Sequence, residues 1–263
     1  MSDVTAVVPV KRLDAAKSRL ALPPAQRRAL ALAFALDTVE ALVGCAAVAA
    51  VVVVTADPDA GARLRRRGVR VVPEQGPGLV PAVHAGIRAA VAWQPRAGVL
   101  VVPADLPCLR PVDVDEVLRS AGGASGAFVP DRSGTGTTLA HHPRGPYGVV
   151  AVPQYGPGSA ARHAALGLRA LADAPVRARQ DVDTLDDLHD AAVLGTGAAT
   201  WAALSALAGG PAGDPDDPAH EHAVERLVGV LGDRAGEPVG QLVDDGRRRV
   251  GDVLAVGAHP PQP

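Results

Sequence analysis

The sequence predicts an α/β fold in which helices cover a mostly parallel β-sheet. Short Val-rich runs alternate in the first half of the chain with longer segments rich in Ala, Leu and Arg. The Val-rich runs are almost continuously apolar, as parallel strands are when both faces of their sheet are buried. Their alternation with helical segments is typical of βαβ units. A length of 263 residues fits one such domain with an additional segment.

Four strands and four helices are predicted in the first half of the chain. The strands are expected at Val4–Val10, Ala49–Thr55, Val69–Pro73 and Gly98–Pro103. The helices between them are expected at Pro24–Val43, Asp59–Arg67, Leu79–Trp93 and Val112–Ala121. Ligands of open α/β sheets gather at the carboxyl ends of the strands, so functional residues are sought directly after these runs.

The second half of the domain is less regular. Its expected strands are Ala127–Pro130, Thr137–His141, Gly148–Pro153 and Val176–Val182, and its expected helices are Ser159–Leu171 and Leu185–Leu194. Thr184 opens the sequence T-L-D-D, an N-cap signature for the last of these helices.

The composition changes after about Ala208. Gly209–Pro218 reads GGPAGDPDDP, a linker by composition, and His220–Leu231 has a modest helical pattern. We therefore divide the chain into a domain at residues 1–208 and a Gly/Pro-rich linker with a C-terminal extension at residues 209–263.

The overall composition excludes several classes of function. The net charge is −2 and aromatic residues make up only 2% of the chain, which argues against nucleic-acid binding. Cys45 and Cys108 lie in apolar runs and are expected to be buried thiols. The apolar run Val4–Val10 precedes the first basic residues, the reverse of a secretory signal, and Ala41–Ala56 is too short to span a bilayer. A cytosolic protein that does not enter membranes is expected.

Four basic residues follow the first strand within nine positions: Lys11, Arg12, Lys17 and Arg19. A triphosphate requires such a concentration of cationic donors, because charge on its oxygens must be neutralised as pyrophosphate leaves. The alternative is a solvated basic turn. The loop does not have the spacing of a Walker A motif.

Three aspartates form the acidic candidates. Asp105, in A-D-L-P, follows a buried strand, where a carboxylate is costly unless it is paired or binds a cation; helix capping is the alternative. Asp181 and Asp183 alternate along a predicted strand and so share a face, where they repel unless a cation lies between them. Together the three suit one or two Mg²⁺ ions.

Two loops combine glycines with hydroxyl groups: Gly134–Thr137 and Tyr155–Ser159. Glycine permits close approach of backbone amides to a phosphate, and Ser159 lies where a helix should begin. Each loop alone is also compatible with an ordinary turn. His141, His142 and His163 have no metal-ligand spacing and are interpreted as surface or satisfied polar residues.

Five segments in order resemble one family, over about residues 4–194: V-P-V-K-R-L-x-x-A-K-S-R-L, A-D-L-P, D-R-S-G-T-G-T, Y-G-P-G-S-A-A-R-H and D-V-D-T-x-x-D-L. They are similar to the CofC/FbiD guanylyltransferases of coenzyme F420 biosynthesis. The resemblance implies a single three-layer α/β/α nucleotidyltransferase domain like that of MobA. It also implies transfer of GMP from GTP to the phosphate of phosphoenolpyruvate, giving enolpyruvoyl-2-diphospho-5′-guanosine and pyrophosphate.

The resemblance also implies roles for individual residues. Mg²⁺ would be held by Asp105, Asp181 and Asp183, and phosphoenolpyruvate by Thr137, Gly156 and Ser159. The nucleotide phosphates would meet Lys11, Arg12, Lys17 and Arg19, with Lys17 and Asp105 as the catalytic pair. Two positions depart from the family pattern: Leu79–Val80–Pro81 stands where relatives commonly have Leu-Asn, which leaves guanine recognition open, and Ala104 replaces a glycine.

Three alternatives remain open at the level of sequence. The acceptor could be 2-phospho-L-lactate, or another phosphorylated compound in a related nucleotidyltransferase, or the chain could be a degenerate nucleotide-binding scaffold. The expected partners are GTP and a small phosphoacid. A homodimer and direct hand-off of the unstable product to the next enzyme of the pathway are further expectations.

Overall fold

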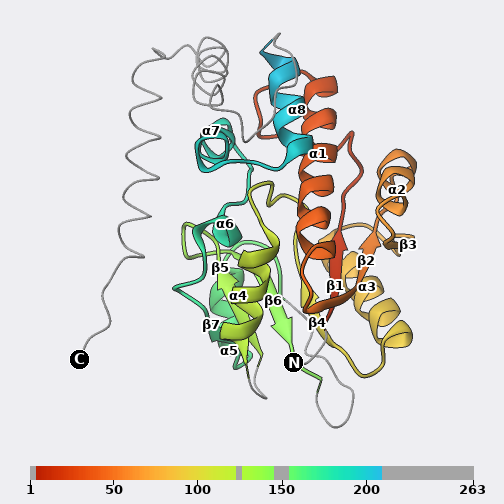
Figure 1. The fold of residues 1–263 in the computed structure, drawn as a ribbon, viewed down its shortest axis with the longest axis vertical. Helices are drawn as coiled ribbons and strands as arrows, with labels where there is room; N and C mark the ends of the chain where they lie inside the picture. The colour runs from red at the N-terminus through yellow and green to blue at the C-terminus, as the bar shows by residue number, and fades with distance from the viewer. Residues whose placement is uncertain (1–3, 123–125, 145–153, 209–263) are drawn as a thin grey trace, which may run out of the picture.

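The computed structural model describes residues 4–122, 126–144 and 154–208 (Figure 1). In this part of the chain one sheet has the strand order β3-β2-β1-β4-β6-β5-β7. The strands are β1 Val4–Pro9, β2 Val48–Val54, β3 Arg70–Val72, β4 Gly98–Val101, β5 Ala127–Pro130, β6 Thr137–His142 and β7 Arg169–Ala170. All neighbours pair in parallel except β6, which is antiparallel to β4 and β5. The predicted, mostly parallel sheet is confirmed.

Helices cover both faces of the sheet, giving three layers. They are α1 Pro24–Val43, α2 Pro58–Arg65, α3 Leu79–Trp93, α4 Pro111–Ala121, α5 Ser159–Ala165, α6 Val176–Arg179, α7 Leu185–Leu194 and α8 Ala198–Leu207. Buried residues of α1, α2 and α4 share one apolar cluster with one set of strand side chains. On the other face α3 packs on the alternate residues of β1, β2 and β4, and α5 on those of β5 and β6. Alternation of side chains along each strand produces this division.

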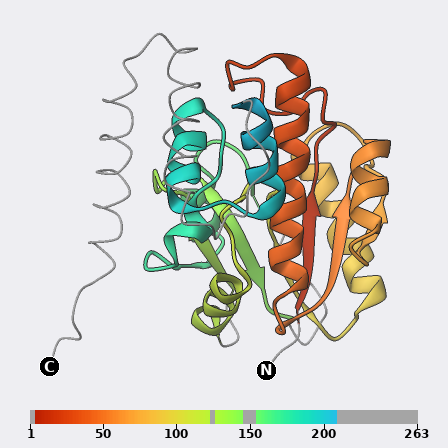
Figure 2. The same cartoon turned by 45° about the horizontal axis from the view of Figure 1, so that its top comes forward.

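A second small core lies beyond the carboxyl ends of the parallel strands. There α7 and α8 enclose Leu188 and Leu204 against Phe34 of α1. Figures 1 and 2 both show α8 beside α1. The buried carboxylate of Asp37 in α1 accepts the N–H groups of Ala199 and Thr200 at 2.9 and 2.7 Å. It thereby satisfies backbone donors at the start of α8 that have no partner within the helix.

The structure corrects two sequence predictions. Val176–Val182 is not a strand, because Val176–Arg179 forms α6 and the residues that follow have no regular secondary structure. The helical turn lets Arg177 bind Asp113, while Arg179 donates to the carbonyls of residues 130 and 131. The helix begun by Ser159 ends at Ala165, and β7 pairs with β5 beyond Gly167, which has a φ of 81°.

The structure contains one helix that the sequence analysis missed, and some predicted segments lie outside the residues that it describes. Helix α8 was not predicted, because it is rich in Ala and shows no polar face. The predicted strand Gly148–Pro153 and everything proposed for residues 209–263 lie outside the described residues.

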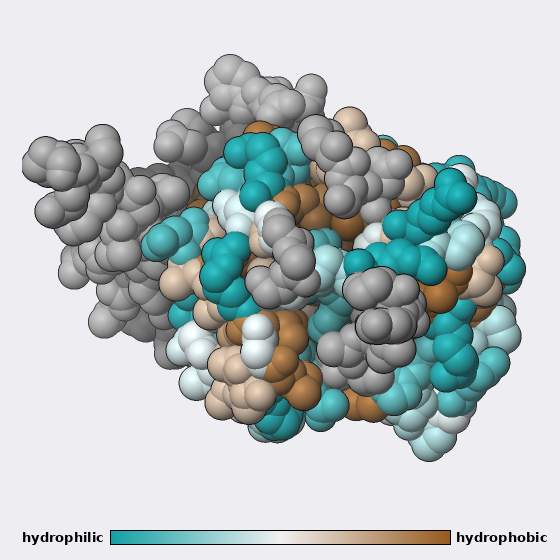
Figure 3. Space-filling model, turned by 90° about the horizontal axis from the view of Figure 1, so that it is seen from below, coloured by the Kyte–Doolittle hydropathy of each residue, from teal (hydrophilic) through white to brown (hydrophobic). Residues whose placement is uncertain are grey.

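The burial of the cysteines and the mixed polarity of the surface agree with what the composition predicts. Cys45 and Cys108 are buried free thiols, as predicted. The face seen in Figure 3 has hydrophobic patches interspersed among hydrophilic residues, as is usual for a water-exposed surface. In the described ranges, none of the helices has the length and apolar character needed to cross a membrane.

Candidate active site

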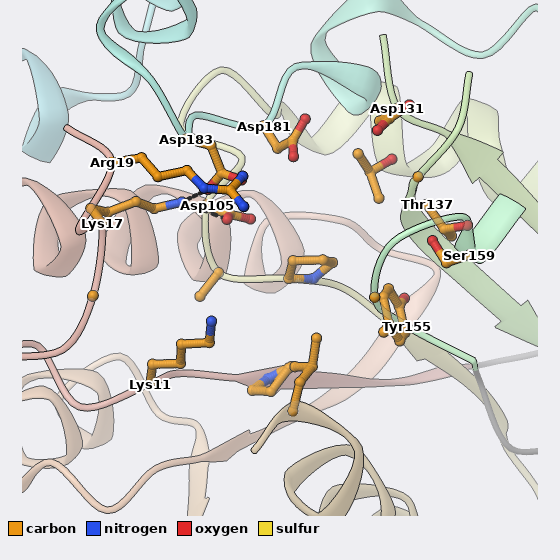
Figure 4. A pocket seen from close by; sticks show the side chains of 18 of the residues that line it. Lys11, Lys17, Arg19, Asp105, Asp131, Thr137, Tyr155, Ser159, Asp181 and Asp183 are labelled. Carbon is orange, nitrogen blue, oxygen red and sulfur yellow. Dashed lines mark hydrogen bonds and ion pairs between the residues drawn. The ribbon is translucent and has the colours of Figure 1, made fainter. Parts of the chain in front are cut away.

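A cavity of about 670 Å³ opens at the carboxyl ends of β1 and β4. Its walls come from the loop after β1, the loop after β4, the β5–β6 turn, the start of α5 and the connection between α6 and α7. Figure 4 shows Lys17 and Arg19 with the predicted aspartates at one end, and the hydroxyl groups of Thr137 and Ser159 with Asp131 at the other. The cavity thus lies at the edge of the sheet where the sequence analysis sought functional residues.

The basic loop after β1 is held in place by its backbone. Val10 donates its N–H to the carbonyl of Val54 at 2.8 Å, and Leu13 donates to the buried Asp57 carboxylate at 3.0 Å. The other Asp57 oxygen caps the start of α2. Leu13 and Leu20 are buried, so the loop is anchored by apolar side chains near both ends. The basic residues between them are thereby presented at a defined place.

Lys17 is the most constrained residue of this loop. Its ammonium group donates to Asp105 at 2.6 Å and to Asp183 at 3.0 Å, and only 9% of its side chain is exposed. Burial alone would lower the pKa of Lys17, but attraction to Asp105 and Asp183 outweighs this and raises the pKa above its usual value. Its φ of 54° lies in the left-handed region, which costs a non-glycine residue about 1 kcal/mol or more. The two ion pairs hold it there.

The three predicted aspartates come from two segments that are hydrogen bonded to each other. The N–H of Val182 donates to the carbonyl of Asp105 at 3.1 Å. Asp181 and Asp183 flank Val182 and both line the cavity. Both therefore face the same space, as predicted, although the segment is not a strand of the sheet.

The surroundings of Asp181 and Asp183 shift the pKa values of these two carboxyl groups in opposite directions. Burial raises the pKa of Asp181 to about 7, and the negative charges of Asp105 and Asp183 act in the same direction. Burial also acts to raise the pKa of Asp183, but Lys17 and Arg19 outweigh it and hold that pKa below its usual value. Among the described residues, basic side chains therefore pair with Asp105 and Asp183 and not with Asp181.

The donor set of the cluster fits the predicted metal in its chemistry. In the described ranges, no group of three His, Cys, Asp or Glu side chains is arranged to hold a metal ion. Lys17 instead bridges two of the carboxylates. Mg²⁺ nevertheless prefers carboxylate oxygens. Oδ1 of Asp105 is buried without a hydrogen-bond partner among the described residues, and Asp181 lies beside it without an ion pair in the same ranges.

The hydroxyl end of the cavity is built by β6 and α5. Because β6 is antiparallel to β4, its first residue, Thr137, lies at the edge where β4 ends. Ser159 begins α5, and the N–H of Ala160 donates to the carbonyl of Thr135 at 3.1 Å, which joins the two predicted loops. Gly156, with a φ of 114°, turns the second loop in a conformation that favours glycine. Thr137, Gly156 and Ser159 all line the cavity.

The basic residues are only partly brought together. Lys11, Lys17 and Arg19 line the cavity. Arg19 is 77% exposed, with its guanidinium 3.7 Å from Asp183. Arg12 does not line the cavity in the described structure, and its guanidinium pairs with Asp14 on the surface.

Two cavity residues were given no role from the sequence. Asp131 follows β5 as Asp105 follows β4, and this position was the signal that could have identified it. A Cβ atom at Gly136 would collide with the Asp131 carboxylate, so a larger residue there would displace that side chain. Tyr155 lies within the predicted Gly-rich loop, and its hydroxyl donates to the carbonyl of Val101 at 3.1 Å. It ties that loop to β4.

Comparison with known proteins agrees with this arrangement. Residues 31–210 match the family described as the MobA-like NTP transferase domain. A protein of Thermomonospora curvata named phosphoenolpyruvate guanylyltransferase is 51% identical over 204 residues, which cover 76% of this chain and 87% of that protein. One of the same name from Salinispora arenicola is 46% identical, over 74% of this chain and 91% of its own length.

A solved structure shows the same fold. It comes from Desulfovibrio desulfuricans and is provisionally named a nucleotide-diphospho-sugar transferase; it aligns with a TM-score of 0.52 at 18% identity, over 72% of this chain and 86% of its own. The chain is therefore a nucleotidyltransferase that belongs to the MobA-like NTP transferase family, together with the curated proteins named phosphoenolpyruvate guanylyltransferase.

Proposed function

We propose that the protein transfers GMP from GTP to the phosphate of phosphoenolpyruvate, releasing pyrophosphate. The observation that carries this proposal is the two-ended cavity, with Lys11, Lys17 and Arg19 at one end and the hydroxyl groups of Thr137 and Ser159 at the other (Figure 4). One end suits a triphosphate and the other a small anionic acceptor. The names of the relatives support the same pair of substrates.

The protein's contribution to the chemistry is positioning and charge stabilisation. A phosphate oxygen of phosphoenolpyruvate attacks the α-phosphorus of GTP, and the bond to the bridging oxygen of pyrophosphate breaks. No protein base is needed, because a phosphate monoester with a second pKa of about 6 is largely deprotonated at pH 7. Lys17 and Arg19 stabilise the negative charge that develops on pyrophosphate.

We assign Asp105, Asp181 and Asp183 as the residues that would hold Mg²⁺. The unpartnered oxygen of Asp105 and the raised pKa of Asp181 support this assignment. A bound Mg²⁺ would neutralise charge on the triphosphate oxygens. Lys17 already neutralises part of the charge of the carboxylates, since it lies between Asp105 and Asp183.

The direct test is turnover with each candidate acceptor. Purified protein is incubated with GTP, Mg²⁺ and either phosphoenolpyruvate or 2-phospho-L-lactate, and pyrophosphate release is measured. The proposal predicts a much higher kcat/KM with phosphoenolpyruvate. A clear preference for 2-phospho-L-lactate, or release only with a sugar phosphate, would refute the choice of acceptor. If no pyrophosphate is released with any acceptor, the protein is not the proposed enzyme and the alternative of a nucleotide-binding scaffold is favoured.

A substitution distinguishes the two ends of the cavity. Ser159→Ala removes a hydroxyl donor and is expected to raise the KM for the phosphoacid by about tenfold or more, since a hydrogen bond to a charged group contributes about 1.5–3 kcal/mol. The KM for GTP should change little. Ser133→Ala is the matched control, because Ser133 lies in the neighbouring turn, does not line the cavity and bonds Asp131. If Ser159→Ala instead raises the KM for GTP more than that for the phosphoacid, the two substrates have been assigned to the wrong ends of the cavity.

We place the reaction in coenzyme F420 biosynthesis, on the five motifs that resemble the CofC/FbiD family. Loss of the coenzyme after deletion of the gene would test this. A homodimer and hand-off of the product remain proposals, and mass in solution with and without the next enzyme of the pathway tests both.

A further inference from the structure

His163 is a buried histidine directly behind the hydroxyl end of the cavity. It lies in α5, four residues after Ser159, and is fully buried. Its ring packs between Phe128 and Tyr155, with both ring centroids 5.5 Å away. The interpretation of the three histidines as surface or satisfied polar residues is confirmed for His163, whose ring nitrogens both have partners. It is wrong for His141 and His142, which are buried and each have one ring nitrogen without a hydrogen-bond partner among the described residues.

Both ring nitrogens of His163 have hydrogen-bond partners. Nε2 lies 2.8 Å from the backbone nitrogen of Gln154, and Nδ1 lies 2.9 Å from Oγ1 of Thr137. A backbone N–H only donates, so Nε2 must be the acceptor and carries no proton. In the neutral ring the proton therefore resides on Nδ1. Burial lowers the pKa of His163 to about 4, which keeps the ring neutral near pH 7.

The tautomer determines what Thr137 can do. Nδ1–H donates to Oγ1 of Thr137, so the Thr137 hydroxyl proton must point in another direction. Thr137 lines the cavity, and His163 is its one side-chain hydrogen-bond partner in the described structure. Its hydroxyl is thereby left to donate into the cavity. With one of its two lone pairs occupied by His163, the hydroxyl has its proton available for an anionic oxygen in the cavity.

We propose that His163 is a positioning residue, whose Nδ1–H holds the Thr137 hydroxyl as a hydrogen-bond donor to the anionic oxygens of the phosphoacid. This rests on the proposed function, in which Thr137 contacts the phosphoacid. The contact to Gln154 has a separate role, because it tethers the loop that leads to Gly156. The two roles use different ring atoms, so they are separable by substitution.

Two variants separate the two roles. Asn places an amide nitrogen near the position of Nδ1, so His163→Asn keeps a donor for Thr137 and loses the acceptor for Gln154. Gln reaches the position of Nε2, so His163→Gln keeps that acceptor and loses the donor. We expect His163→Gln to raise the KM for phosphoenolpyruvate about tenfold and that for GTP less than about twofold. His163→Asn should keep the phosphoenolpyruvate KM within about threefold of wild type, even if its melting temperature falls.

The control is His142→Gln, which makes the same change at a buried histidine that does not line the cavity in the described structure. It should leave both KM values unchanged. A double-mutant cycle with Thr137→Val adds a direct test of coupling. Without the Thr137 hydroxyl, His163→Gln should have no further effect on the phosphoenolpyruvate KM. If the effects of His163→Gln and Thr137→Val on the phosphoenolpyruvate KM multiply in the double mutant, the proposal is overturned. A larger KM increase in His163→Asn than in His163→Gln would also overturn it.

One measurement does not depend on turnover. Long-range ¹H–¹⁵N NMR spectra of the ligand-free wild-type protein report which ring nitrogen carries the proton. We expect the Nδ1–H tautomer for His163 at pH 7. An Nε2–H tautomer or a charged ring would overturn the inference, even in an active enzyme. If the tautomer is Nδ1–H but the wild type does not use phosphoenolpyruvate, the proposed function fails and the positioning of Thr137 stands.

Discussion

Replacement of Lys17 by Met tests whether an internal cation holds the acidic cluster together. The Lys17 ammonium lies 2.6 Å from Asp105 and 3.0 Å from Asp183. At an effective dielectric constant of about 20, each contact corresponds to an attraction on the order of 6 kcal/mol, offset by the cost of burying the charges. Met keeps the apolar stem and removes the charge, so the carboxylates are left to repel one another.

The expected loss in free energy of unfolding depends on how exposed the two carboxylates that pair with Lys17 are. Removing one member of a buried ion pair costs about 3–5 kcal/mol. Asp105 is 25% and Asp183 48% exposed, and solvent screens such pairs, so we expect the lower end, about 3 kcal/mol. For a domain of this size that is about 6–12 °C in melting temperature.

The assay is thermal unfolding in EDTA and at increasing Mg²⁺. Because Mg²⁺ would replace the missing positive charge, Lys17→Met should gain more stability from the metal than the wild type gains. Arg12→Met is the matched control from the same loop, since Arg12 pairs with Asp14 on the surface and its loss should change the melting temperature little. Equal melting temperatures for the two variants in EDTA would refute the reasoning.

Three further predictions follow from the site and its surroundings. Asp183→Asn should fold and lose most activity at limiting Mg²⁺, because a neutral amide binds the ion poorly; near-normal turnover would remove Asp183 from the metal site. Burial lowers the pKa values of His142 and His163 to about 4. The unfolded chain therefore binds more protons between about pH 6.5 and 4, and stability falls as the pH falls through this range, by up to about 3 kcal/mol for each histidine. Urea unfolding at a series of pH values measures this, and an unchanged slope in His142→Gln would contradict it. Removal of residues 209–263 should leave kcat intact, since every residue assigned a role lies before residue 185; a large loss of kcat without unfolding would contradict that boundary.

Local features of the sequence determined most of the sheet and its helices. The bounds of α1, α3 and α7 agree with the prediction, because apolar runs and helix signals act within a few residues. Thr184 caps α7 through a reciprocal pair of hydrogen bonds with Asp187, as its T-L-D-D signature predicted. The carboxyl ends of the strands also located the cavity correctly, because parallel strands bring their ends to one edge.

Tertiary contacts decided what local patterns do not encode. Val176–Arg179 became a helix because its arginines reach Asp113 and the β5–β6 turn. The same applies inside the site. Lys17 meets carboxylates 88 and 166 positions away in the sequence, whereas Arg12 in the same loop turns to its neighbour Asp14. The protonated nitrogen of His163 is likewise set by Gln154, on the loop before α5, and by Thr137, on β6. Which cation neutralises which carboxylate, and which atom donates to which, depends on distances between separate elements, and only packing of the complete domain fixes those distances.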